Sequence, residues 1–185
     1  RQIQTSQRIR KQQNGNNMST LKISGIIRES IVDGPGIRFV VFTQGCPHHC
    51  PGCHNPQTWP FTGGVEKTPE EIFAEIIKNP LLRGVTFSGG EPFCQPEGLA
   101  ELAQMVHSRG LNIITYTGYT FEELLEKSKD DPAVLALLKQ TNILIDGPFI
   151  QELKSYDLKF IGSSNQRIID AKRSLEKGEA VIANI

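Results

Sequence analysis

The chain of 185 residues carries 20 basic and 20 acidic side chains, and 38% of its residues are hydrophobic. This length suits one domain with its own core, and the balanced charge gives no sign of a nucleic-acid-binding protein. No apolar run approaches the roughly 20 residues of a membrane span, and the chain does not begin with a secretory signal, so we expect a cytoplasmic protein.

Residues 1–17 are polar and rich in Gln and Asn, with Ile3 and Ile9 as their aliphatic residues. Such a segment buries too little apolar surface to offset the entropy lost on ordering. We therefore expect a disordered tail, or an extension that is not native, followed by one domain over residues 18–185.

Strands and helices are predicted to alternate along that domain. The hydrophobic patterns predict strands over residues 21–27, 37–43, 84–88, 111–115 and 142–145. They predict helices over residues 69–78, 97–109, 121–127 and 132–139. Thr68 with Glu71, and Thr120 with Glu123, have the spacing of capping boxes. Helices between strands at this spacing indicate an α/β fold with a mostly parallel sheet.

Polar segments follow several of these strands, where parallel α/β sheets usually place their sites. The first contains Cys46, Cys50 and Cys53 in the spacing C-x3-C-x2-C. Three thiolates can hold a metal centre and leave one coordination position open for chemistry. Thiolates select zinc, copper or iron–sulfur clusters. The three histidines of the same loop leave a Cys3His zinc site open, although zinc ligands usually come from two well-separated pairs.

The second polar segment is Ser88-Gly89-Gly90-Glu91. A Gly-Gly turn allows bare backbone to approach a ligand, but a tight connection between a strand and a helix needs it equally. Asp146, at another strand end, either binds a cation or cofactor or caps the following turn.

Three further residues have simpler interpretations. Cys94 is expected to be a buried thiol that packs as a small hydrophobic group. Asp33 and Arg38 either form a surface ion pair, which we favour for Arg38, or shape a groove for a partner.

The cysteine loop, followed at the next strand end by Gly-Gly-Glu, resembles the radical S-adenosylmethionine superfamily. The resemblance implies a partial, open (β/α) barrel in which the three cysteines ligate one [4Fe-4S] cluster. The open iron would bind the amino and carboxylate groups of S-adenosylmethionine. The residues implied to contact this cofactor are Gly52, Cys53, His54, Ser88, Gly89, Gly90, Glu91, Tyr116, Thr117, Gly118 and Asp146. Many members have an aromatic residue where this chain has Gly52. No catalytic side chain is implied, because the cofactors carry the radical chemistry.

Two further stretches narrow the resemblance. The run from Val32 to Phe39, Val-Asp-Gly-Pro-Gly-Ile-Arg-Phe, is similar to the activating enzymes of glycyl radical enzymes. Residues 116–119 and 162–167 point to the activators of anaerobic ribonucleoside-triphosphate reductase. Such an enzyme reductively cleaves S-adenosylmethionine and generates a glycyl radical on its partner, with a one-electron donor such as flavodoxin; it can be a homodimer.

The alternatives are an activator of pyruvate formate-lyase, a radical enzyme of the deazapurine pathway that acts on a small molecule, and a non-catalytic zinc or electron-transfer module.

Overall fold

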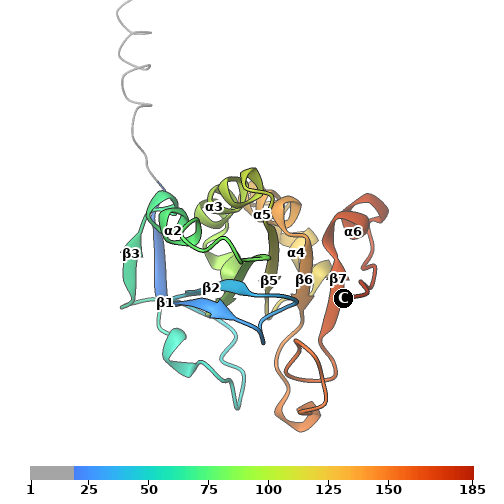
Figure 1. The fold of residues 1–185 in the computed structure, drawn as a ribbon. Coiled ribbons are helices and arrows are strands. Elements are labelled where there is room, and N and C mark those ends of the chain that lie inside the picture. The colour runs from blue at the N-terminus through green and yellow to red at the C-terminus, as the bar shows by residue number, and fades with distance from the viewer. Residues whose placement is uncertain (1–18) are drawn as a thin grey trace, which may run out of the picture.

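The computed structural model describes residues 19–185, so the predicted tail over residues 1–17 lies outside the described residues. One sheet with the strand order β3-β1-β2-β4-β5-β6-β7 organises the fold (Figure 1). Its strands are β1 (Leu21–Ser30), β2 (Arg38–Thr43), β3 (Val65–Lys67), β4 (Gly84–Gly89), β5 (Asn112–Tyr116), β6 (Ile143–Asp146) and β7 (Arg167–Asp170).

The four central strands, β2, β4, β5 and β6, run parallel to one another. At the edges, β1 pairs antiparallel with β2 and β3, and β7 pairs antiparallel with β6. Within residues 19–185 the two edge strands β3 and β7 do not pair with each other, so the sheet stays open. The predicted α/β fold with an open, partial barrel is confirmed, whereas the short strands β3 and β7 were not predicted.

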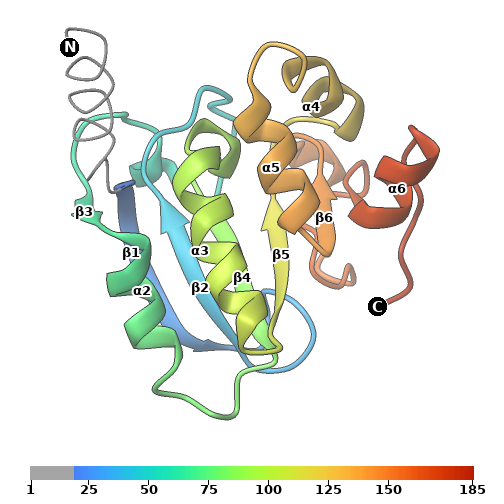
Figure 2. The same cartoon turned by 90° about the horizontal axis from the view of Figure 1, so that it is seen from above.

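Five α-helices accompany the sheet in the described part of the chain. They are α2 (Pro69–Ile76), α3 (Pro96–Ser108), α4 (Phe121–Lys127), α5 (Pro132–Gln140) and α6 (Ala171–Lys177). Figure 2 shows α2, α3 and α5 lying over one face of the sheet. Both predicted capping boxes are present at the starts of α2 and α4. Helix α6 was not predicted.

Side chains alternate between the two faces of each strand. On β2, Phe39 and Val41 belong to the hydrophobic core beneath the helices. Arg38 and Val40 therefore lie on the opposite, inner face, where both are fully buried.

The prediction that Arg38 forms a surface ion pair is wrong, because the Arg38 side chain is fully buried on the inner face of the sheet. Its Nε donates to Thr86 Oγ1 at 2.7 Å, and its other nitrogens donate to Asn112 Oδ1 at 2.8 Å and the Val85 carbonyl at 2.8 Å. Burial lowers the pKa of Arg38 to about 10. Arg38 thus joins β2, β4 and β5 at the ends where these strands begin.

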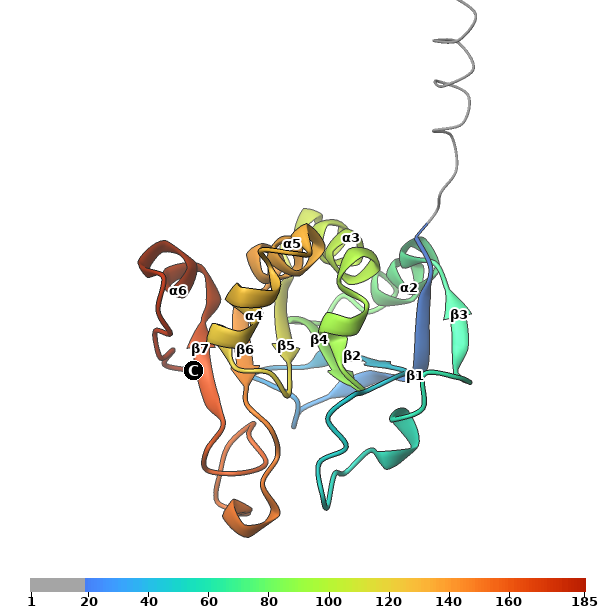
Figure 3. The ribbon, with the colours of Figure 1, turned by 180° about the vertical axis from the view of Figure 1, so that it is seen from behind.

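Two segments project on the side of the molecule away from the helices (Figures 1 and 3). One is the loop between β2 and β3, which contains the three clustered cysteines. The other is the connection between β6 and β7, residues 147–166, which we call the lobe. None of the helices in residues 19–185 is long and apolar enough to cross a bilayer.

Candidate cofactor site

A cavity of about 440 Å³ lies where β2, β4, β5 and β6 end. The cysteine loop, the Gly-Gly turn after β4, the segment from Tyr116 to Gly118 and the lobe all contribute to its lining. Four segments far apart in the sequence therefore meet at one place, and the strand-end argument predicted this for the first three of them.

The three clustered cysteines all line this cavity. Cys46 is buried, Cys50 and Cys53 are half-buried, and none of them forms a disulfide. Burial raises the pKa of the Cys46 thiol. Three soft sulfur donors on one loop, open to a shared cavity, fit a cluster held by thiolates.

Each of the three histidines in the loop makes a contact with another side chain. His48 Nε2 lies 2.7 Å from a Glu91 carboxylate oxygen, His49 stacks on Trp59, and the His54 ring packs against Phe149. In the described part of the chain, no three His, Cys, Asp or Glu side chains converge as ligands of a single metal ion do. The structure thus places no histidine as the fourth ligand of a Cys3His zinc site.

Gly89 and Gly90 line the cavity, and the backbone of β2 and the residues after it passes very close to both. A Cβ atom on Gly90 would lie 2.3 Å from the carbonyl oxygen of Gly45, the residue before Cys46. Gly89 has φ +91°, and a Cβ there would lie 2.6 Å from the Phe42 Cα. The two glycines are needed for the tight connection, and the same connection brings bare backbone to the cavity, as the approach to a ligand would require.

Glu91, for which we expect a direct cofactor contact, is not among the residues that line the cavity. Its side chain is fully buried behind the cavity wall. One carboxylate oxygen accepts from Thr117 Oγ1 at 2.9 Å and from the Phe93 N–H at 3.0 Å. The other accepts from the Gly118 N–H at 2.9 Å and from His48 Nε2 at 2.7 Å. The ring nitrogen must be the donor, because a carboxylate only accepts.

Gly118 leaves the space that this arrangement needs. A Cβ atom on Gly118 would lie 2.5 Å from His48 Cδ2. The Tyr119 ring packs edge-on against the imidazole at 4.4 Å. Through His48, Glu91 therefore joins the cysteine loop to the segment that follows β5.

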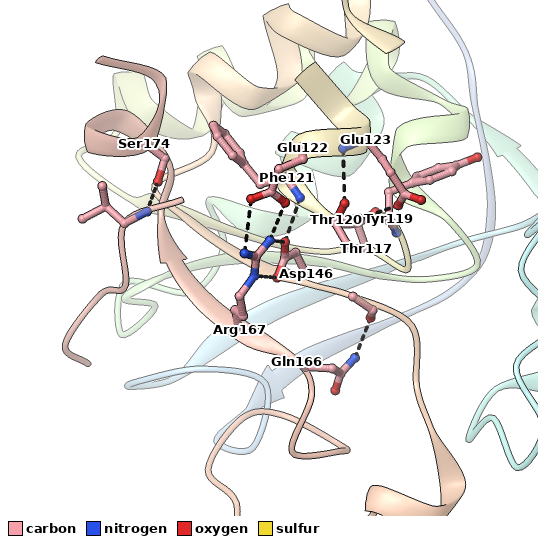
Figure 4. Close-up of polar contacts among 12 residues, drawn as sticks. Thr117, Tyr119, Thr120, Phe121, Glu122, Glu123, Asp146, Gln166, Arg167 and Ser174 are labelled. Carbon is pink, nitrogen blue, oxygen red and sulfur yellow. Dashed lines mark hydrogen bonds and ion pairs between the residues drawn. The ribbon is translucent and has the colours of Figure 1, made fainter. Parts of the chain in front are cut away.

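Asp146 also lies outside the cavity lining, where its neighbour Gly147 takes part instead. Its carboxylate accepts from the Phe121 N–H at 2.7 Å and from Arg167 at 2.6 and 3.0 Å (Figure 4). Arg167 also contacts Glu122 at 2.7 Å and thereby lowers the pKa of that carboxyl group. Asp146 therefore joins β6 and β7 to the start of α4, which accounts for its buried carboxylate without a cofactor.

Two other predicted positions differ from the structure. Gly52 is exposed outside the cavity, and a Cβ there would lie 2.8 Å from the side chain of Gln151 in the lobe. Cys53 and His54, which follow it, do line the cavity. Cys94 is exposed rather than buried, because the short 3₁₀ helix Pro92–Cys94 buries Phe93 and leaves the thiol outside.

The lobe supplies a wall of the cavity that was largely missed. Its apolar contributions are Phe149, Leu158, Phe160 and Ile161. Only residues 162–167, the end of the lobe and the first residue of β7, stood out in the sequence, and Gly162 and Gln166 do line the cavity. The available signal was the apolar content of a long connection between strands, since such connections are usually short or functional.

Comparison with known proteins identifies the family. The family model of a 4Fe-4S single cluster domain matches residues 32–169. The chain is 37% identical over 145 residues to the anaerobic ribonucleoside-triphosphate reductase-activating protein of Salmonella typhi, covering 74% of this chain and 90% of that protein. The chain belongs to the radical S-adenosylmethionine activating enzymes.

Other relatives carry related names. The anaerobic ribonucleoside-triphosphate reductase-activating protein of Escherichia coli K12 is 35% identical over 148 residues, covering 74% of this chain and 90% of that protein. The pyruvate formate-lyase-activating enzyme of Clostridium pasteurianum is 39% identical over 127 residues, covering 65% of this chain and 53% of that enzyme. Among solved structures, QueE from Escherichia coli gives a TM-score of 0.44 at 21% identity over 55% of this chain and 53% of that chain, too limited a likeness to support an argument.

Membership in this family confirms three predictions. The protein is an enzyme, and its cofactors are a [4Fe-4S] cluster and S-adenosylmethionine. The superfamily inferred from the cysteine loop and the Gly-Gly-Glu turn is correct.

Proposed function

We propose that this activating enzyme generates a glycyl radical on an anaerobic ribonucleoside-triphosphate reductase. The observation that carries the proposal is the match to proteins named for that activation over 90% of their length, at 37% identity.

We assign Cys46, Cys50 and Cys53 as the ligands of the cluster, because all three line one cavity. When bound, the cluster and S-adenosylmethionine supply one-electron cleavage of a carbon–sulfur bond and, through it, hydrogen-atom abstraction. No protein acid or base is needed for this chemistry. The protein's part is to position the cofactor and its target and to exclude water.

The other cavity residues are assigned by their place around the thiols. Ser88, Gly89 and Gly90 bring backbone to the amino-acid end of S-adenosylmethionine. The segment Tyr116–Gly118 and the backbone at Cys53–His54 contact its nucleoside end. We assign to Glu91 and Asp146 the role of holding these segments in place.

The character of the cavity supports a polypeptide as the second substrate. Among residues 19–185, neither Lys nor Arg lines it, and the lobe covers one side with apolar side chains. A small substrate that carries phosphate or carboxylate groups usually needs such cations. The glycine that an activator targets carries no charge and needs no such cation, which favours an activator over an enzyme of small-molecule metabolism.

Electron paramagnetic resonance tests the proposal. Anaerobically reconstituted enzyme, S-adenosylmethionine and a reductant are mixed separately with an anaerobic ribonucleoside-triphosphate reductase and with pyruvate formate-lyase. We expect a glycyl radical signal on the reductase, and none when Cys50→Ser enzyme is used. A signal on pyruvate formate-lyase alone would instead establish the alternative activator.

Three features remain predictions. They are flavodoxin as the electron donor, a homodimer and a cytoplasmic location. Replacing the chemical reductant by reduced flavodoxin in the same assay tests the first.

A further inference from the structure

Trp59 lines the cofactor cavity, and its indole nitrogen is a buried donor without a partner in the described structure. Within residues 19–185 it is the one buried side-chain nitrogen or oxygen without a hydrogen-bond partner. Trp59 lines the cavity together with the three clustered cysteines. Buried donors are nearly always paired, because an unpaired one has lost its water without compensation. The indole N–H therefore needs an acceptor that the polypeptide does not supply.

The backbone holds Trp59 beside the first cysteine. The Cys46 N–H donates to the Trp59 carbonyl at 3.0 Å, and the Gly45 N–H donates to the Thr58 carbonyl at 2.7 Å. The Gln44 side chain adds a hydrogen bond to the Pro60 carbonyl at 2.6 Å. These hydrogen bonds attach residues 58–60 to residues 44–46, where the cysteine loop begins.

The ring of Trp59 is also held on one face. The imidazole of His49 stacks on it with ring centres 4.7 Å apart and planes inclined by 9°. His49 lies between Cys46 and Cys50, so the stack connects the indole to the cysteine loop itself. The indole is thereby placed before any cofactor binds.

We propose that the Trp59 N–H donates a hydrogen bond to a sulfur atom of the bound cluster, either a sulfide or a cysteine Sγ. This inference rests on the proposed binding of the cluster by the cysteine loop. Hydrogen bonds to sulfur are among the factors that set the reduction potential of a cluster. Because reduction adds negative charge to the cluster, a donor stabilises the reduced state more than the oxidised state. Trp59 thus raises the potential at which the enzyme accepts its electron.

The chain allows a direct test because Trp59 is its only tryptophan. Growth on ¹⁵N-indole-labelled tryptophan labels this one nitrogen. Electron–nuclear double resonance of the reduced cluster, without S-adenosylmethionine, is expected to show coupling to that ¹⁵N and to its exchangeable proton. Coupling that appears only after S-adenosylmethionine is added, or no coupling at all, would overturn the proposal in favour of the cofactor or a water molecule as acceptor.

A matched pair of variants provides a second readout. Trp59→Phe keeps an aromatic ring for His49 but removes the N–H, and we expect its cluster to have a more negative reduction potential. His49→Asn removes the stacked ring but keeps the N–H; Asn tolerates the positive φ of 49° at that position. Its potential is expected to lie between those of Trp59→Phe and the wild type, because the N–H is kept while the stack that holds the indole is lost. Equal potentials in Trp59→Phe and wild type would count against the hydrogen bond.

The two levels of inference fail differently. Wild-type protein that assembles no cluster would refute the proposed function and this proposal together. Wild-type protein that assembles a cluster without coupling to the indole would refute only the role of Trp59.

Discussion

At the scale of single residues, Glu91 is a buried charge that four donors satisfy from three parts of the chain. These donors belong to the cysteine loop, the turn after β4 and the segment after β5. A charged acceptor with several donors is strongly stabilised, but removing its charge leaves those donors poorly paired. The Glu of the Gly-Gly-Glu turn thus acts on the cofactor cavity through the segments that it joins.

We expect Glu91→Gln to lower the free energy of unfolding by about 1–3 kcal/mol, because the amide NH₂ faces donors where a carboxylate oxygen accepted. Urea denaturation of the cofactor-free protein, followed by circular dichroism, measures this change. The control is Glu179→Gln, an exposed position, where we expect a change within about 0.5 kcal/mol. Equal effects of the two substitutions would contradict the joining role of Glu91.

At the scale of elements, the lobe contains little helix or strand, and hydrogen bonds and an ion pair hold it in place. The Arg167–Asp146 ion pair joins the two strands at its base, and the Gln166 side chain bonds to the Gly147 carbonyl at 3.0 Å and to the Gly162 N–H at 2.8 Å. Further along, the Tyr116 hydroxyl donates to the Phe160 carbonyl at 2.6 Å. Phe160 has φ +65°, a conformation that costs a non-glycine residue about 1 kcal/mol or more. Tyr116 therefore holds a strained residue of the lobe against the cavity.

Tyr116→Phe is expected to reduce the free energy of unfolding by about 1 kcal/mol near neutral pH, since one hydrogen bond is lost. Burial raises the pKa of Tyr116 above its ordinary value of 10, so the folded protein keeps the hydroxyl protonated after the unfolded chain has begun to ionise. The wild type therefore loses stability as the pH rises above about 10, and the variant lacks this contribution.

Denaturation curves at a series of pH values check this expectation. The difference between wild type and Tyr116→Phe should shrink above about pH 10. A difference that stays constant across that range would show that the hydroxyl is not buried as a donor.

At the scale of the whole molecule, the cavity exists because parallel strands end together. Most of the segments that line it follow β2, β4, β5 and β6, with Val32 and Asp33 added from the connection between β1 and β2, and every described element lies after residue 18. The interpretation of residues 1–17 as a tail outside the domain remains a prediction.

A chain that begins at Met18 is expected to bind as much iron and acid-labile sulfide as the full chain, because the three cysteines and the residues around them are retained. Cys50→Ser in the same shortened chain is the control, and its iron content should fall. A shortened chain that no longer assembles a cluster would show that residues 1–17 contribute to the site.

Much of this organisation could be predicted from local sequence patterns. The capping boxes at Thr68 and Thr120 use contacts three residues apart, and the hydrophobic periods reflect which face of each element is buried. β7 could not be predicted in this way, because its four residues become a strand only by pairing with β6. Arg38 likewise has its acceptors on β4 and β5, far along the chain.

The sequence by itself determined the α/β order and the three-cysteine loop, because these depend on residue types at fixed spacing, and it indicated the family by resemblance. Only the tertiary structure decided which polar groups reach the cavity. Glu91 and Asp146 lie at strand ends as the cavity residues do, yet their carboxylates accept hydrogen bonds from distant segments. Conversely, the indole of Trp59 became a candidate partner of the cluster because no distant segment provides its acceptor in the described structure. Hydrogen-bond partners brought together by folding are not encoded in local spacing, so this distinction required the structure.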